Sequence, residues 1–167
     1  VACAACVVCL AATSEPSSPV GRPPRIEPDY LGVTVPPNIA PLNFLVREGG
    51  SRFRVRITSQ QGNPIEIDSR SAKIVIPEKQ WRRLLAGNRG QDLAFETLVQ
   101  AESGWRRFDT FSVRVAKEDI DDYLVYRRIH PAHSAWRDMG IYQRDLRTFD
   151  ESTILTNDYF RGGCVNC

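Results

Sequence analysis

The sequence has few of the residues that catalysis or nucleic-acid binding requires. It holds two histidines and one methionine among its 167 residues. No Ser-His-Asp set, phosphate-binding loop or paired-carboxylate signature rises above chance. Its 22 basic and 20 acidic residues leave a net charge of +2, which gives no reason to expect a nucleic-acid partner. We therefore expect no nucleic-acid binding and leave open whether the protein is an enzyme.

Long hydrophobic runs and internal repeats are missing as well. Residues 1–12 are uncharged and almost all Ala, Val, Leu and Cys, but this stretch is too short to span a bilayer. A polar stretch rich in proline and serine follows. Residues 1–12 therefore match the hydrophobic part of a signal peptide that lacks its charged start. We expect an exported protein of the periplasm or cell envelope, in an oxidising compartment.

Three cysteines in this segment indicate a lipid anchor as an alternative to simple cleavage. A bacterial lipobox places small residues before the cysteine that becomes acylated. Cys6 follows two alanines and fits best, Cys3 is possible, and Cys9 follows two valines and fits poorly. Ordinary cleavage near Ala12 would remove all three. We expect lipidation of Cys6, and contact with a membrane only through that anchor.

The next two segments differ sharply in pattern. Residues 13–28 predict a Pro/Ser-rich tether without regular structure. Over residues 29–116, short stretches alternate apolar and polar residues, with turn signals about every ten residues. The clearest case is Phe53, Val55 and Ile57, which alternate with arginines. With 42% apolar residues overall, this pattern predicts a mainly β fold, an immunoglobulin-like β-sandwich of seven or eight strands.

One short helix is expected inside the sandwich domain, between Pro77 and Gly87. Proline is favoured at the start of a helix and glycine just after its end. Trp81, Leu84 and Leu85 have the spacing that places them on one helix face. We expect this face to close one end of the sandwich.

Residues 117–167 predict a helical and irregular segment. Acidic residues crowd the start of 118–129 and arginines lie near its end, an arrangement that matches the helix dipole. Ser134 predicts the cap of a second short helix that ends at Gly140. From Asp145 to Gly163 no regular pattern is visible.

The chain ends on Cys164 and Cys167, a Cys-x-x-Cys pair preceded by two glycines. Two thiols at this spacing add across the two vinyl groups of a porphyrin, and a histidine directly after them binds the iron. That position lies beyond Cys167, so covalent haem c is expected on condition that histidine follows. The same pair also occurs as half of a zinc site, a redox pair or a disulfide. We expect this chain to be part of a longer protein, because it stops inside the motif.

A haem iron also needs a ligand on its second face, or an open position there. The chain offers Met139, His130 and His133. Met139 lies between Trp136 and Tyr142, aromatic residues suited to line a haem, although core packing is the commoner role of a methionine. His130 precedes a proline and His133 lies in the connecting turn, where surface positions are the alternative. The second ligand is otherwise a residue beyond Cys167.

Five stretches of the sequence carry a family resemblance. They are PPNIAPLNF at 36–44, WRRLLAGNRG at 81–90, YRRI at 126–129, MGIYQR at 139–144 and GCVNC at 163–167. Over residues 26–167 the chain resembles the N-terminal part of Bacteroidetes envelope proteins of the cytochrome c biosynthesis or TolB-like propeller type. The resemblance implies a histidine after the last cysteine, and a β-propeller later in the full-length chain.

Two functions from different classes follow. The first is an envelope-located c-type haem-binding protein, with electron transfer or redox sensing as its role. The second is a non-enzymatic interaction or scaffold module of an exported lipoprotein, in which the sandwich holds a partner or a glycan. In that case Cys164 and Cys167 form a disulfide or bind a structural metal. The residue after Cys167 separates the two.

Overall fold

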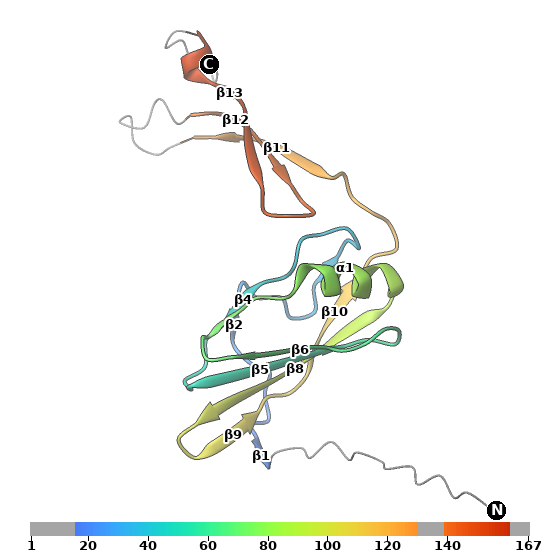
Figure 1. Ribbon diagram of the computed structural model, residues 1–167, viewed down its shortest axis with the longest axis vertical. Helices are drawn as coiled ribbons and strands as arrows, with labels where there is room; N and C mark the ends of the chain where they lie inside the picture. The colour runs from blue at the N-terminus through green and yellow to red at the C-terminus, as the bar shows by residue number, and fades with distance from the viewer. Residues whose placement is uncertain (1–15, 130–138, 161–167) are drawn as a thin grey trace, which may run out of the picture.

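The structure, a computed structural model, describes residues 16–129 and 139–160 and is mainly β (Figure 1). A seven-stranded main sheet and a three-stranded small sheet enclose a hydrophobic core, and another three-stranded sheet, the C-terminal sheet, follows. The predicted mainly β sandwich is confirmed. The elements are β1 (Ser17–Pro19), β2 (Ile26–Glu27), β3 (Thr34–Val35), β4 (Phe44–Val46), β5 (Arg52–Thr58), β6 (Ile65–Ser69), β7 (Lys73–Ile74), α1 (Glu78–Gly87), β8 (Asp92–Ala101), β9 (Gly104–Arg107), β10 (Phe111–Val115), β11 (Tyr123–Arg128), β12 (Gly140–Asp145), β13 (Glu151–Thr156) and the 3₁₀ helix η2 (Asn157–Phe160).

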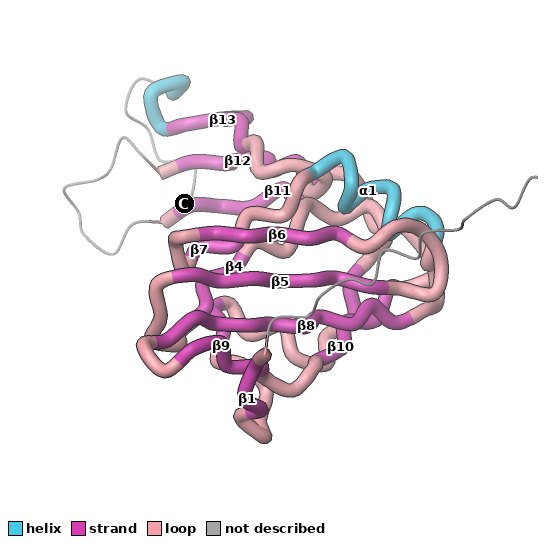
Figure 2. Tube along the Cα trace, turned by 60° about the horizontal axis from the view of Figure 1, so that its bottom comes forward, coloured by secondary structure: helices cyan, strands magenta, loops and turns pink. Residues whose placement is uncertain are grey.

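The main sheet is organised around β8, its longest strand (Figure 2). Along one edge β8 pairs with β5, from Thr58 opposite Ala94 to Arg52 opposite Gln100, and β6 extends the sheet beyond β5. Two strands share the other edge, β10 along the first half of β8 and β9 along the second. The sheet therefore branches there, because β3 adds to β10 and β1 adds to β9.

The alternation in β5 sets which face of the main sheet is buried. Phe53, Val55 and Ile57 are at most 3% exposed, as the sequence predicts. The arginines between them point away from the core, and Arg52 and Arg54 both donate to Asp68 on β6, at 2.6 and 2.8 Å. Because successive side chains of a strand point to opposite faces, the alternating sequence of β5 places its apolar side chains in the core and its charged side chains in solvent.

The small sheet and α1 complete the core. In the small sheet Phe44 on β4 lies opposite Ile74 on β7, and both are buried. The helix buries the three residues predicted to do so, Trp81, Leu84 and Leu85. Trp81 is fully buried, and its indole Nε1 donates to the carbonyl of Ile39 at 3.1 Å. The expectation for this helix is confirmed.

Two predictions of secondary structure made from composition are wrong. The segment 13–28, expected to be a tether, contains β1 and β2, which pair with β9 and β4. The segment 118–129, expected to be a helix, contains the strand β11. Its acidic residues serve tertiary contacts instead of a helix start, since Asp119 pairs with Arg89 and Asp122 with Arg147. The segment contains Tyr123, Val125 and Tyr126, residue types that favour strands.

The C-terminal sheet is a three-stranded antiparallel meander with β12 at its centre. It includes β13, in a region where the sequence predicts no regular structure. Gly140, expected to end a helix, is instead the first residue of β12. A Cβ atom at this position would lie 2.4 Å from the carbonyl oxygen of Leu155, so the close approach of β12 and β13 requires glycine. Residues 134–138 of the second expected helix lie outside the described residues.

Candidate functional site

The C-terminal sheet is held against the sandwich by a small polar joint. The side-chain amide of Asn38 donates to the carbonyl of Ile120 at 2.8 Å, and its oxygen accepts from the amide of Ile120 at 3.1 Å. The backbone amide of Ala40 donates to the carbonyl of Leu146 at 2.7 Å. These contacts fix the end of the sheet that contains the β12–β13 turn, and the opposite end points away from the sandwich (Figure 1).

That opposite end contains the described residues that are nearest in sequence to the candidate haem ligands. Arg128, the last residue of β11, lies opposite Gly140, the first residue of β12. Thr156, the last residue of β13, lies on the other side of Gly140. The segment that begins after Ile129 and the segment that follows η2 therefore leave the described structure from the same sheet end. The first contains His130 and His133, and the second contains Cys164 and Cys167.

Met139 is the one candidate ligand among the described residues. It directly precedes Gly140 at this sheet end and is half-buried, and its carbonyl oxygen accepts from the amide of Asn157 at 3.4 Å. Asn157, the first residue of η2, is fully buried. The start of β12 is thus tied to the element that leads toward Cys164. His130, His133, Cys164, Cys167 and the lipidation candidates Cys6 and Cys3 lie outside the described residues.

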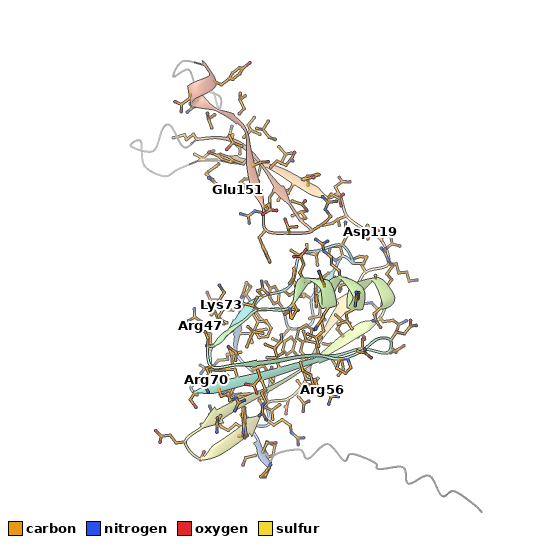
Figure 3. All side chains as sticks on the ribbon, viewed as in Figure 1. Arg47, Arg56, Arg70, Lys73, Asp119 and Glu151 are labelled. Carbon is orange, nitrogen blue, oxygen red and sulfur yellow. The ribbon has the colours of Figure 1, made fainter. Side chains whose placement is uncertain are left out.

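One face of the C-terminal sheet carries a network of tyrosines and charges. Glu151 accepts from Tyr126 and from the guanidinium of Arg128, and from Arg144 at 3.1 Å (Figure 3). These hydrogen bonds lower the pKa of Glu151, and the bond from Tyr126 has the largest effect. The ring of Tyr142 stacks on Tyr126, with centroids 6.2 Å apart, and Arg128 lies 4.1 Å above it. Because Tyr142 is only 7% exposed, it does not offer the haem-lining surface expected from sequence.

A second candidate site lies on the sandwich, around the buried carboxylate of Glu48. Its side chain is 3% exposed. Arg22 donates to both carboxylate oxygens, at 2.7 and 2.9 Å, and the backbone amide of Arg25 donates at 2.9 Å. These bonds, led by that from Arg22, lower the pKa of Glu48 to about 2. Glu48 is therefore ionised at neutral pH and fixes Arg22 and the backbone of Arg25 beside it.

The same residues line an open hollow of about 930 Å³. Its lining is of mixed charge, with Arg22, Arg25 and Arg106 beside Glu48 and Glu102. Ser51, Ser103 and Gln100 add hydrogen-bonding groups. Three other basic residues, Arg47, Arg70 and Lys73, lie toward one end of the sandwich (Figure 3). Lys73 is paired with Leu45, which comes two residues before Arg47 in the sequence. Sequence analysis missed this site because Arg22 and Arg25 fall in the segment interpreted as a tether.

The pKa of Glu48 leads to a prediction about acid stability. Its carboxylate stabilises the fold above the unfolded pKa of about 4.5, and this contribution is lost as the pH falls toward about 2. We expect Glu48→Gln to reduce the free energy of unfolding by roughly 2 kcal/mol at pH 7, less than the full shift implies because the arginines are partly solvated. The difference between parent and variant should shrink toward pH 2. Urea unfolding across this range measures it, and a difference that stays constant with pH would contradict the assignment.

Within residues 16–129 and 139–160, no three His, Cys, Asp or Glu side chains are grouped so as to hold a metal ion. The helices in this part of the chain include none that is long and apolar enough to cross a bilayer.

Comparisons with protein-family models, with curated proteins and with solved structures each returned no match for this chain.

Proposed function

We propose that the protein is an envelope-located c-type haem-binding protein that serves electron transfer or redox sensing. The haem is attached through Cys164 and Cys167, on condition that a histidine follows them. One observation supports the proposal: the register of the C-terminal sheet brings Arg128, Gly140 and Thr156 to one end of the sheet, and Met139 directly precedes Gly140 there.

Met139 is the described residue at this sheet end that would bind a haem iron. Met139 supplies a thioether, which binds haem iron and raises its reduction potential. Its half-buried position next to Gly140 leaves it close to the surface where the cysteine-bearing segment begins. When bound, the haem supplies one-electron chemistry. Cys164 and Cys167 would attach it, and His130 and His133 are the other candidates for its second ligand.

Covalent attachment is tested with the full-length gene. The codon after Cys167 is read first, because any residue except histidine there contradicts the haem proposal. Co-expression with a cytochrome c maturation system should then give a red protein whose colour stays with the polypeptide in acid-acetone, since thioether bonds do not extract. Colour that extracts completely would show that no covalent haem has formed.

Met139 is tested by replacement with leucine in the haem-loaded protein. The swap nearly conserves volume and should cost less than ~1.5 kcal/mol as a packing change. If the thioether binds iron, the reduction potential should fall and any sulfur-to-iron charge-transfer band should disappear. Unchanged potential and spectrum would assign Met139 to packing. The second ligand would then be His130, His133 or a residue beyond Cys167, or the position would be open.

The location belongs to the same proposal. The protein is exported and anchored through a lipid on Cys6, and a β-propeller follows Cys167 in the full-length chain. Labelling of cells with a palmitate analogue tests the anchor. Cys6→Ala should lose the label, whereas Cys9→Ala should keep it as the matched control. A parent protein without label, with a mature N-terminus near Thr13, would indicate ordinary secretion instead.

The hollow around Glu48 favours a second candidate function, a non-enzymatic module that holds a partner or a glycan. Guanidinium groups suit carboxylate, sulfate or phosphate groups, and the serines and Gln100 suit hydroxyls. In this alternative the cysteine pair forms a disulfide or binds a structural metal. Titration of the protein with acidic oligosaccharides, with Arg25→Gln as the variant, tests it. Binding by the parent that weakens in the variant supports this function.

A further inference from the structure

Another hollow of the sandwich lies between α1 and the loop that joins β5 to β6, where the end of the helix is beside that loop (Figure 2). Residues 62–65 line it from the loop, and Gln80, Arg83 and Leu84 line it from the helix. Its volume of about 420 Å³ is in the range of small-ligand sites. We call it the α1 hollow. It shares no lining residue with the hollow around Glu48.

The loop side of the α1 hollow is fixed by the side chain of Asn88, which is fully buried. Its amide nitrogen donates to the carbonyl of Gln61 at 2.8 Å and to the carbonyl of Leu84 at 2.7 Å. Its amide oxygen accepts from the backbone amide of Gln61 at 3.1 Å. A buried polar group with satisfied hydrogen bonds holds its partners in one arrangement. The α1 hollow is therefore formed before any ligand enters.

Three exposed side chains at the α1 hollow have unused hydrogen-bonding groups. The guanidinium of Arg83 and the side-chain amides of Gln80 and Asn63 have no hydrogen-bond or ion-pair partner within the described residues. A guanidinium presents parallel N–H donors that match the two oxygens of a carboxylate. A side-chain amide both donates and accepts, so it suits the polar groups beside a carboxylate.

No acidic side chain competes for the charge of Arg83. The residues that line the α1 hollow include no Asp or Glu. The acidic residues nearest to the lining in sequence are Glu66 and Glu78. Glu66 pairs with Arg56 at 3.4 Å, and Glu78 pairs with Arg82 at 2.5 Å. The positive charge of Arg83 is therefore available to an anionic ligand.

The rest of the lining is apolar or has no side chain. Pro64 is exposed, and Ile65 and Leu84 are buried beneath the surface. Gly62 has a φ of 94°, a conformation that favours glycine. A Cβ atom at this position would lie 3.9 Å from Cδ1 of Leu84, a space that glycine leaves open. The α1 hollow thus has room for a short apolar group next to its charged side chain.

We propose that the α1 hollow binds a small organic carboxylate that carries a short apolar group. Arg83 binds the carboxylate through two N–H···O hydrogen bonds. Asn63 and Gln80 bind the polar groups beside it, and Pro64 packs against the apolar group. This site goes beyond the proposed haem function, because all of its residues belong to the sandwich.

The test titrates the full-length protein with three related compounds, followed by ligand-observed NMR. N-acetylleucine has a carboxylate, an amide and an isobutyl group. N-acetylleucinamide lacks the charge, and N-acetylglycine lacks the isobutyl group. N-acetylleucine should bind about tenfold more tightly than its amide, because hydrogen bonds to charged groups are the stronger ones. It should also bind more tightly than N-acetylglycine, because its isobutyl group leaves water on binding.

Two arginine variants locate the binding site. Arg83→Gln removes the guanidinium from the α1 hollow. Arg70→Gln is the matched control, because Arg70 is also exposed and without a partner within the described residues, and it follows the far end of β6. Arg83→Gln should weaken the binding of N-acetylleucine by about tenfold, and Arg70→Gln should leave it unchanged. Both side chains are exposed, so both variants should unfold at the same urea concentration as the parent.

Three results would overturn the inference. Equal affinity for N-acetylleucine and its amide would show that no cation binds the carboxylate. Equal weakening by the two variants would show that only the net charge matters and that Arg83 forms no site. Failure of all three compounds to bind would leave the α1 hollow without the proposed ligand class. None of these measurements involves haem, so their failure leaves the proposed function intact, and a protein without covalent haem would still bind N-acetylleucine.

Discussion

Replacing both Cys164 and Cys167 by alanine will abolish covalent haem in the full-length protein and leave the stability of the sandwich unchanged. The haem is lost because thioether bonds require both thiols. Stability is kept because the core consists of residues 26–115, upstream of the pair. Acid-acetone extraction of the co-expressed protein measures the first effect, and thermal unfolding of the sandwich measures the second.

Cys9→Ala is the matched control, since it removes a thiol that fits neither the haem motif nor the lipobox. This variant should retain full covalent haem. Retention of covalent haem in the double alanine variant would place the attachment elsewhere. A large loss of sandwich stability in that variant would indicate that the pair forms a structural disulfide or metal site instead.

The largest loss of stability is expected from Trp81→Ala. The side chain is fully buried where α1 meets the core, so its removal leaves a cavity that the surrounding strands cannot close. The carbonyl of Ile39 also loses its indole donor. We expect a loss of about 3–5 kcal/mol in the free energy of unfolding.

Urea unfolding followed by circular dichroism measures this effect, with Gln80→Ala as the control on the exposed side of the same helix. The control should stay within about 0.5 kcal/mol of the parent. A loss below about 1 kcal/mol for Trp81→Ala would mean that the residue is not part of the packed core.

The sandwich could be predicted because its strands obey a local rule. Phe53, Val55 and Ile57 alternate with arginines, and a period of two decides which side of a strand is buried without reference to any partner. The helix α1 is equally local, since Pro77 and Gly87 frame it and Trp81, Leu84 and Leu85 share one face. The alternation of a strand and the ends and apolar face of a helix can both be recognised in a single sequence.

The errors arose where tertiary contacts outweigh local preference. Acidic residues before 123 and arginines at 127–128 imitate the charge pattern of a helix, but Asp119 and Asp122 bind Arg89 and Arg147. Their role depends on partners 25 or more residues away in the sequence. In the same way, β1 exists only because Ser17 to Pro19 lie beside β9, and a Pro/Ser-rich composition gives no sign of that pairing.

The candidate site shows the same limit. The sequence identifies Met139, His130, His133 and the cysteine pair by residue type. It does not show that Met139 lies at one end of a sheet, because that depends on Gly140 pairing with both Arg128 and Thr156.

Peptide mapping of the mature full-length protein by tandem mass spectrometry tests the central claim most directly. The protein is co-expressed with a cytochrome c maturation system and digested, and the peptide that contains Cys164 and Cys167 is isolated. The account predicts a peptide heavier by one haem, with both cysteine sulfurs bonded to the porphyrin and a histidine directly after Cys167. A peptide without haem, with the two cysteines free or joined to each other, would contradict it.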